Sequence, residues 1–504
     1  MTMYKQKTKN YVRHSVIRNA VESLTEKRGQ SCCVKRPYVR DVYDYFSSMD
    51  ESREKTEVSK IDVNYIKEWE RMHDTYIGTK RPEDLSVCYL AGPEPENDFN
   101  EFISTGVLPQ NIWAFEFDKN TYLQALNSFE GDDFMQPKII KTSIEYFFKN
   151  TPKKFDIVYI DACATFVSSR NALKCISALF KYHRLNSPGV LISNFAYLDD
   201  KNEQELKEYV DMIALYNYVA NNSRNKLLDT EDALCLSKKF FCEQNEVQNN
   251  LVFHYGEFIT RMLCNIASIS IPVKRFVNSN YLKYLISEPD KKLDNCTLQE
   301  INNIKDNNLY KYFMFKNYIQ SKGIEFNGNE KIDKLIQQIE VKNEEYNIIR
   351  SIEIINNIKC QKIKANDDLD KIFEFFEKDN MYQFLDKPNK IFFFDTVINQ
   401  LSYPMHYVCD NIKRYTYVAK EKRMFTDLII FDECRYIYDW VPAIDQITRS
   451  FSNLSWQYVF RFAIDGLIKQ RINYNNEFFY GGSVVPLKTE GFKDKTISER
   501  ERVN

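Results

Sequence analysis

The spacing of apolar side chains changes along the chain and predicts different elements in different regions. Up to about residue 80, apolar positions recur every three or four residues, as at Val39, Val42, Tyr43 and Phe46, which is typical of amphipathic helices. From residue 85, short apolar runs of strand length alternate with amphipathic helical stretches. Such alternation predicts βα units that build a parallel sheet.

Five apolar runs carry the strand pattern, and helical pattern separates each run from the next. We predict strands at residues 86–91, 111–117, 138–142, 155–161 and 189–195. Strands that alternate with helices in this way predict an α/β fold with a doubly wound, mostly parallel sheet. Ligands of such sheets bind beyond the carboxyl ends of the strands, so the residues that follow each strand are candidates for a functional site.

The regions outside these strands differ in pattern. Residues 1–80 predict a helical, basic N-terminal region, and residues 201–375 predict a mainly helical region. Residues 376–504 predict a mixed α+β, aromatic-rich region. Its segments KIFFFDTVI, YTYVAK, TDLIIFDECRYIYDWV and NEFFYGGSVV have the aromatic and β-branched composition of strands, whereas WQYVFRFAIDGLIKQR has the pattern of a buried helix.

Composition narrows the class of protein. No apolar stretch is long enough to span a membrane, and no apolar segment follows the charged start, so we expect a cytoplasmic protein without a membrane anchor. The twelve cysteines include no CxxC pair, and no histidine lies at zinc-finger spacing. We therefore expect reduced thiols and no metal site.

Charge is unevenly distributed, although the net charge is only −2. The first forty residues carry ten Lys or Arg against two Glu, which indicates either an arm that binds RNA, DNA or an acidic partner, or a solvated helical face. Near the C-terminus, aromatic residues surround four arginines. This second segment could stack with single-stranded nucleic acid, or it could form an aromatic core or the interface of a homo-oligomer or protein complex. The arginines are Arg435, Arg449, Arg461 and Arg471.

The residues that follow the first two strands are acidic. Gly92 is followed by Pro93, Glu94, Pro95 and Glu96. Each proline removes an amide donor and stiffens the loop, and the two carboxylates would repel phosphate but could accept hydrogen bonds from an ammonium group. A dinucleotide site is therefore disfavoured here.

The second strand ends in an acid at the spacing expected for a group that binds ribose hydroxyls. Glu116 lies 24 positions after Gly92 and is followed by Phe117 and Asp118. The sequence IWAFEFDKNTYLQAL resembles the second-strand motif of class I S-adenosylmethionine-dependent methyltransferases, and FDIVYIDACATF is similar to their fourth-strand motif. The resemblance covers residues 85–200 and implies a Rossmann-like, methyltransferase-type domain at residues 81–200 that binds S-adenosylmethionine.

On this resemblance, particular residues acquire cofactor-binding roles. Glu116 would hold the adenosine ribose, Phe117 would lie against adenine, and Ser143 would sit near the adenine amine. Gly92 and Glu94 would belong to the loop at the methionine end, and Asp161 would lie beside the methyl donor. The first loop departs from the family pattern because it has one glycine instead of two or three, and two prolines.

Asp161 is the candidate catalytic residue. It could orient or deprotonate the methyl acceptor, or it could cap the helix that follows. Cys163 could be a nucleophile, although a small buried residue is the alternative interpretation. The loop lacks the Asn/Asp-Pro-Pro-aromatic signature of enzymes that methylate exocyclic amines of bases.

The acidic segment LIIFDEC allows a different chemistry. It looks like the acidic strand of P-loop nucleotidases, but no GxxxxGK[ST] accompanies it, which argues against an ATPase. Asp427, Asp432 and Glu433 could instead hold Mg²⁺ in a nuclease, or they could be structural.

Two functions follow from the sequence. The first is a divergent S-adenosylmethionine-dependent methyltransferase that acts on a macromolecule such as RNA or DNA. The second keeps the fold without the chemistry, as a catalytically inactive scaffold or a nucleic-acid-associated subunit of a multiprotein complex.

Overall fold

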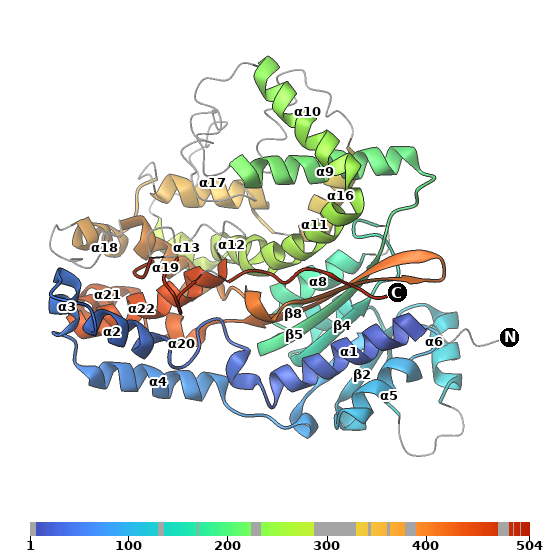
Figure 1. Ribbon diagram of the computed structural model, residues 1–504, viewed down its shortest axis with the longest axis horizontal. Coiled ribbons are helices and arrows are strands. Elements are labelled where there is room, and N and C mark those ends of the chain that lie inside the picture. The colour runs from blue at the N-terminus through green and yellow to red at the C-terminus, as the bar shows by residue number, and fades with distance from the viewer. Residues whose placement is uncertain are drawn as a thin grey trace.

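One nine-stranded sheet runs through the protein, with helices on both of its faces and a further group of helices beyond one end (Figure 1). The strand order is β3-β2-β1-β4-β5-β8-β7-β9, and β6 pairs with β8. The computed structural model describes residues 7–129, 136–168, 171–222, 233–286, 329–340, 344–359, 363–377, 390–471, 483–486, 488–493 and 495–504.

The first five strands are parallel, as the sequence predicts. They are β1 (Val87–Leu90), β2 (Ile112–Glu116), β3 (Lys138–Lys141), β4 (Phe155–Asp161) and β5 (Leu185–Ala196). The order reverses between β1 and β4, and this is the switch point at which doubly wound sheets form a crevice. The predicted α/β class and the doubly wound arrangement are thus confirmed.

Helices connect these strands and cover both faces of the sheet. They are α5 (Glu96–Ser104), α6 (Lys119–Asn127), α7 (Ile144–Asn150) and α8 (Ala172–Lys181). The helix α7 packs on α8, whereas α5 packs on the N-terminal helix α1 (Lys7–Leu24). Asp118 and Ser143 begin α6 and α7 by accepting hydrogen bonds from the amides of Thr121 and Tyr146.

The same sheet continues with strands from the last third of the chain. They are β6 (His406–Tyr407), β7 (Lys413–Ala419), β8 (Lys422–Asp432) and β9 (Glu501–Arg502). Because β8 is antiparallel to β5, with Ala196 opposite Met424, the turn between β7 and β8 lies beyond the carboxyl end of β5. Residues from the predicted 81–200 and 376–504 regions therefore share one sheet.

The remaining elements are helical. The N-terminal region also contains α2 (Tyr38–Ser47), α3 (Arg53–Val58) and α4 (Val63–Ile77). Between β5 and β6 lie α9 (Glu203–Asn222), α10 (Ala233–Asn249), α11 (Leu251–Asn265), α12 (Ile271–Val277), α13 (Asn280–Leu285), α16 (Glu330–Ile339), α17 (Ile348–Lys359), α18 (Asp367–Glu377) and α19 (Lys390–Ser402). After β8 come α20 (Arg435–Tyr438), α21 (Ile447–Phe451) and α22 (Leu454–Arg471). Short helical turns occur at Arg28–Gln30, Pro82–Asp84, Pro109–Asn111, Cys409–Asn411 and Ile444–Gln446, and a π-helical turn, Ile266–Ser270, joins α11 to α12.

One predicted strand is a helix. KIFFFDTVI lies in α19, where Phe394, Val397 and Ile398 are buried at helical spacing. The helix packs on α12 and α18, so tertiary contacts override the strand preference of the aromatic and β-branched side chains. YTYVAK and TDLIIFD form strands as predicted, and most of NEFFYGGSVV lies outside the described residues.

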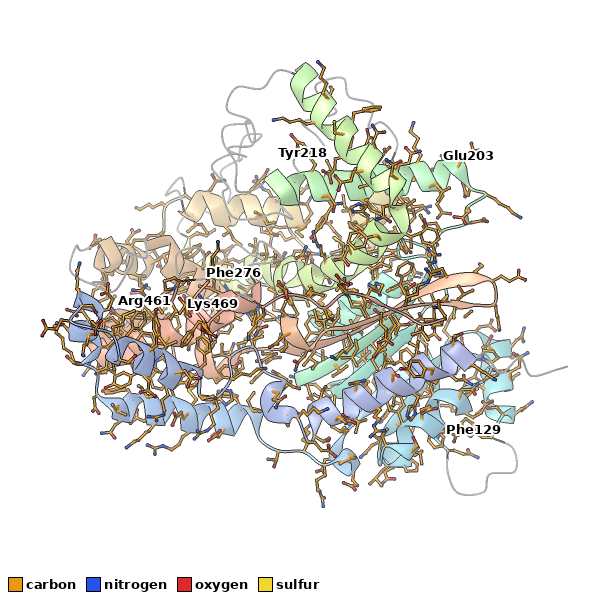
Figure 2. The ribbon with its side chains drawn as sticks, viewed as in Figure 1. Phe129, Glu203, Tyr218, Phe276, Arg461 and Lys469 are labelled. Carbon is orange, nitrogen blue, oxygen red and sulfur yellow. The ribbon has the colours of Figure 1, made fainter. Side chains whose placement is uncertain are left out.

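The predicted buried helix WQYVFRFAIDGLIKQR is confirmed as part of α22, and it carries charges inside the protein. Arg461 and Lys469 lie among the helices beyond the end of the sheet (Figure 2), and each is at most 1% exposed. The Lys469 ammonium pairs with buried Asp465 at 3.6 Å, and Asp465 also accepts hydrogen bonds from the amides of Val484 and Val485. These partners offset the cost of burying the carboxylate.

Among the described residues, no helix combines the length and the apolar character needed to cross a lipid bilayer.

Candidate functional site

The ends of β1, β2 and β4 place the three predicted strand-end residues at one edge of the sheet. In the parallel register, Leu90 lies opposite Phe115 and Tyr89 lies opposite Tyr159. Gly92, Glu116 and Asp161 therefore follow or end neighbouring strands at the same edge, as the sequence predicts. We call this the carboxyl edge.

The loop after β1 is open but contains few free backbone donors. Gly92 has a φ of +60°, a conformation that favours glycine, and a Cβ at this position would meet no atom within 4 Å. The Tyr89 hydroxyl holds the loop in place by donating a hydrogen bond of 2.9 Å to the Pro95 carbonyl. Glu94 is exposed, whereas Oε2 of Glu96 is buried and has no hydrogen-bond partner among the described residues.

Glu116 and Phe117 project from the end of β2. The Asp118 amide donates a hydrogen bond of 2.8 Å to Glu116 Oε1, and the carboxylate is only partly buried. The Phe117 ring is 74% exposed, which is unusual for a large apolar side chain. A side-chain hydrogen-bond acceptor thus lies next to an uncovered aromatic face.

Ser143 follows β3 at the same edge. Its hydroxyl oxygen accepts a hydrogen bond of 3.2 Å from the Tyr146 amide and so caps α7. This capping role accounts for a serine at this position without a ligand, and the predicted contact with adenine stays a prediction.

Asp161 is held by a hydrogen-bonded network at the end of β4. Its carboxylate pairs with the Lys9 ammonium at 2.9 Å and accepts hydrogen bonds from the Cys163 thiol at 3.1 Å and the Asn194 amide at 2.9 Å. The side-chain oxygen Oδ1 of Asn194 in turn accepts a hydrogen bond of 2.8 Å from the Thr426 hydroxyl. Burial alone would raise the pKa of Asp161, but Lys9 and the hydrogen bonds outweigh burial and lower the pKa below its ordinary value.

This geometry excludes one interpretation of Asp161 and one of Cys163 that the sequence left open. Asp161 does not cap the following helix, because α8 begins only at Ala172 and is preceded by Asn171. Cys163 is exposed, not buried, and adopts a φ of 47°. Its thiol turns back to Asp161 in this left-handed turn, which the strand pattern could not reveal.

A second acid lies close enough to Asp161 to interact with it electrostatically. Asp98, on α5, is 7% exposed and accepts a hydrogen bond of 2.7 Å from the Arg13 guanidinium. Burial raises the pKa of Asp98 to about 6 even though Arg13 opposes this shift. Lys9 and Arg13 are four residues apart on α1, so one face of this helix carries both cations into the carboxyl edge.

Sequence reasoning missed the contribution of α1. It interpreted the basic N-terminal segment as an arm or a solvated face, whereas several of its cations have acidic partners within the protein. A signal was present in the sequence, because Lys9 and Arg13 stand at i and i+4 of an amphipathic pattern that also buries Val12, Val16 and Ile17.

The arginine and aromatic segment near the C-terminus is largely internal. Arg461 is fully buried, and the Trp440 and Trp456 rings stack at 5.5 Å within the protein. Arg435 lies over the Tyr403 ring and pairs with Asp439, whereas Arg449 is exposed. The side chain of Arg471 lies outside the described residues.

The three candidate magnesium ligands, two on β8 and Glu433 directly after it, have separate partners. Asp427 accepts hydrogen bonds from Arg500 at 2.5 Å and from Thr260 at 2.6 Å, and Glu433 faces His183 at 3.3 Å. Within the described residues, the group of potential metal ligands around Asp432 contains two cysteines and neither of the other acids. The structure thus does not assemble these three acids into one magnesium site.

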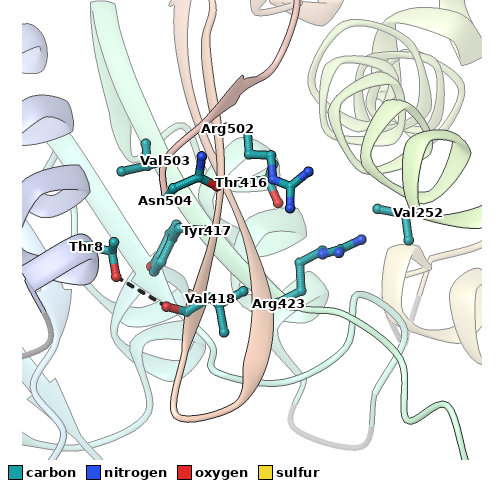
Figure 3. A pocket seen from close by; sticks show the side chains of 9 residues that line it. All are labelled: Thr8, Val252, Thr416, Tyr417, Val418, Arg423, Arg502, Val503 and Asn504. Atoms are coloured by element: carbon teal, nitrogen blue, oxygen red, sulfur yellow. Dashed lines mark hydrogen bonds between the residues drawn. The ribbon is translucent and has the colours of Figure 1, made fainter.

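A cavity of about 330 Å³, whose lining residues are drawn in Figure 3, lies beside the Asp161 network. Tyr417 connects the two, because its side chain lines the cavity and its hydroxyl lies 3.5 Å from Asn194 Oδ1. Arg423 and Arg502 also line the cavity, and neither forms an ion pair with a described carboxylate. The Thr8 hydroxyl donates to the Val418 carbonyl at 3.2 Å and so joins α1 to the cavity wall.

Comparisons with known proteins give weak similarity to methyltransferases. No protein-family model and no curated protein matches the chain. A solved methylase from Haemophilus influenzae is 19% identical over 23% of this chain and 69% of its own, with a TM-score of 0.19. An S-adenosylmethionine-dependent methyltransferase from Clostridium acetobutylicum is 16% identical over 32% of this chain and 65% of its own, with a TM-score of 0.18.

A third solved structure covers more of the chain. The plantazolicin methyltransferase BamL, in complex with a triazolic desmethyl analogue and S-adenosylhomocysteine, is 12% identical over 64% of this chain and 94% of its own, with a TM-score of 0.20. TM-scores of this size do not transfer an activity, a ligand or the role of a residue. The fold assignment rests on strand order and register, and the site rests on the side chains at the carboxyl edge.

Proposed function

We propose that the protein is an S-adenosylmethionine-dependent methyltransferase whose cofactor lies along the carboxyl edge between Gly92, Glu116 and Asp161. The observation that carries this proposal is the pairing of Glu116 with the exposed Phe117 ring at the end of β2. A partly buried carboxylate can accept hydrogen bonds from the two ribose hydroxyls, and an uncovered phenyl face can pack against adenine.

The loop after β1 fits the other end of the cofactor. An amino-acid end carries an ammonium group, and the buried, unpartnered Glu96 Oε2 is an acceptor of the required charge. Glu94 offers a second carboxylate at the exposed side of the loop. The two prolines reduce the number of amide donors, so in this proposal side chains bind the cofactor where glycine-rich loops use backbone amides.

The chemistry at the site is simple. The cofactor supplies a methyl group on a sulfonium, and the protein has to align an acceptor with it in a site that excludes water. The lowered pKa of Asp161 keeps its carboxylate ionised and makes it a weak base. We therefore assign Asp161 to orienting the acceptor through a hydrogen bond, with Lys9 and Asn194 holding the carboxylate in position.

The cavity beside the Asp161 network suggests the class of acceptor. Its two arginines lack acidic partners among the described residues and could bind phosphate groups, while Tyr417 presents an aromatic ring. These groups support RNA or DNA as the macromolecule that is methylated. The internal packing of Arg461 and of the tryptophans gives no such support.

Calorimetric titration with S-adenosylmethionine and S-adenosylhomocysteine tests the cofactor. Glu116→Gln keeps the shape of the side chain and removes its charge, so we expect binding to weaken roughly 10-fold to 100-fold with little change in melting temperature. Glu94→Gln is the matched control, and its effect should be smaller because Glu94 is exposed. Absence of binding by the wild-type protein at millimolar ligand would contradict the proposal.

The acceptor is tested separately, by binding of a fluorescent single-stranded oligonucleotide. We expect the affinity to fall steeply between about 50 and 200 mM salt, and Arg423→Gln or Arg502→Gln to reduce that salt dependence. Arg449→Gln is the control, because Arg449 is exposed on α21, away from the cavity. A salt-insensitive interaction, or equal effects of all three variants, would exclude this nucleic-acid site.

The scaffold hypothesis is favoured by one specific observation. Lys9 and Arg13 neutralise Asp161 and Asp98 from within the chain, so these two acids of the carboxyl edge are already paired without a ligand. If the wild-type protein binds no adenosyl ligand, and Glu116→Gln changes only stability, the scaffold becomes the better account.

A further inference from the structure

The N-terminal region meets the end of β8 at a buried group of sulfur and oxygen ligands. Cys33, Asp432 and Cys434 are 2%, 1% and 0% exposed. A thiol from each cysteine and an oxygen of the carboxylate lie within 4.8 Å of one another. Cys33 lies 399 positions before Asp432 in the sequence, so the fold alone brings these ligands together.

We propose that Cys33, Asp432 and Cys434 bind one structural zinc ion. Two thiolates and one carboxylate suit zinc, whereas magnesium and calcium prefer ligand sets made only of oxygen. The sequence predicts no metal site, because Cys33 and Cys434 belong to no short-spaced motif. This proposal is independent of methyl transfer.

One pair of ligand atoms has the separation expected of a tetrahedral zinc centre. Cys434 Sγ lies 3.5 Å from Asp432 Oδ2. A zinc ion with ordinary bonds to sulfur and oxygen separates two such ligands by about 3.5 Å. The Tyr436 hydroxyl donates a hydrogen bond of 2.7 Å to the same carboxylate oxygen and lies 3.7 Å from Cys434 Sγ, so it borders the ligand group.

The surroundings orient the three ligands. Asp432 accepts hydrogen bonds from the amides of Cys33 and Cys434, each at 2.9 Å, and from the Ser187 hydroxyl at 3.1 Å. Metal-binding carboxylates are commonly held by such outer hydrogen bonds. Cys434 has a φ of 50°, and this left-handed turn folds its thiol back toward Asp432.

The position of the site indicates a structural role. All three ligands are buried, as the ligands of structural zinc are, whereas catalytic zinc keeps a position open to substrate. The Gln470 amide on α22 donates to the Cys33 carbonyl at 3.0 Å, and the Tyr436 hydroxyl accepts from the Val34 amide at 3.1 Å. Zinc would therefore join the segment after α1 to the end of β8 and the start of α20, beside these hydrogen bonds.

The metal content of the full-length protein, purified without a metal-affinity step, tests this proposal. We expect about one zinc ion per chain by mass spectrometry, and little zinc in Cys33→Ser and Cys434→Ser. Cys264→Ser is the matched control, because Cys264 is also fully buried but lies on α11 outside the group. Replacement of zinc by Co²⁺ should produce a thiolate charge-transfer band that each of the two serine variants weakens.

Thermal unfolding with and without a chelator keeps the test decisive if a variant folds poorly. EDTA should lower the melting temperature of the wild-type protein and of Cys264→Ser, but not that of Cys434→Ser. The proposal is overturned if folded wild-type protein contains no zinc and binds neither zinc nor Co²⁺ on refolding. It is equally overturned if the chelator lowers the melting temperature of Cys434→Ser as much as that of the wild-type protein.

Discussion

Asp98 couples protonation to stability at the scale of a single residue. Its folded-state pKa is about 6, whereas its ordinary value is 3.8. At a pH between these two pKa values, the native protein retains a proton that the unfolded chain has lost. The free energy of unfolding therefore falls as the pH rises through this window. The loss is complete above the folded-state pKa.

We therefore expect the wild-type protein to lose roughly 2 to 3 kcal/mol relative to Asp98→Asn between about pH 4 and pH 7. Urea denaturation of both proteins across this range measures the difference. A difference that stays constant with pH would show that the Asp98 carboxyl titrates normally.

Lys9 provides a second prediction at this scale, because it is the cation that holds Asp161 ionised. Lys9→Met would leave a buried carboxylate unpaired and should lower the free energy of unfolding at neutral pH by about 3 kcal/mol. Asp161→Asn in the same chain should restore much of the loss, since the uncompensated charge is then gone. Lys7→Met is the control, because Lys7 is exposed on α1. Equal stability of Lys9→Met and Lys7→Met would mean that the ion pair contributes nothing.

Strand β5 depends on a glycine where its first residues bulge away from β4. The register with β4 shifts between Leu185 and Val190, and a Cβ on Gly189 would lie 2.2 Å from the Asn186 carbonyl oxygen. Because the clash is with backbone, it cannot be relieved by rotating a side chain. Gly189→Ala should destabilise the protein by about 3 kcal/mol or more in chemical denaturation. Gly29→Ala is the control and should leave the stability nearly unchanged, since no atom lies within 4 Å of its Cβ position. If Gly189→Ala also left the stability unchanged, the bulge would be able to shift.

Arg500 connects distant parts of the whole molecule. Its guanidinium pairs with buried Asp427 on β8 at 2.5 Å and donates to the Tyr415 and Gly256 carbonyls, each at 3.0 Å. It thus links the segment before β9 to β7, β8 and α11.

Arg500→Met removes the cation and leaves the Asp427 carboxylate without a charged partner, so we expect a loss of about 3 to 5 kcal/mol. Arg500→Lys should recover only part of this, because an ammonium cannot reproduce the planar set of donors. Lys493→Met, at an exposed position of the same C-terminal segment, is the control for thermal unfolding. If Arg500→Met and Lys493→Met have the same melting temperature, the C-terminal segment is held by its other contacts.

The amino-acid sequence by itself determined the five parallel strands and the acids at their ends. Apolar runs report which faces are buried, and parallel strands bring their carboxyl ends to one edge, so Glu116 and Asp161 could be placed together without coordinates. Their environments could not be read in this way, because Lys9 lies 152 positions from Asp161 and its contact depends on how α1 packs.

The tertiary structure alone decided three further features. It made a helix of the strand-like segment in α19, it added β6 to β9 to the sheet, and it placed Cys33 beside Asp432 and Cys434. Periodicity encodes the buried face of an element, but the partner of that face is chosen by complementary shape and by the satisfaction of buried polar groups. Those requirements arise between segments hundreds of residues apart, and local sequence pattern does not record them.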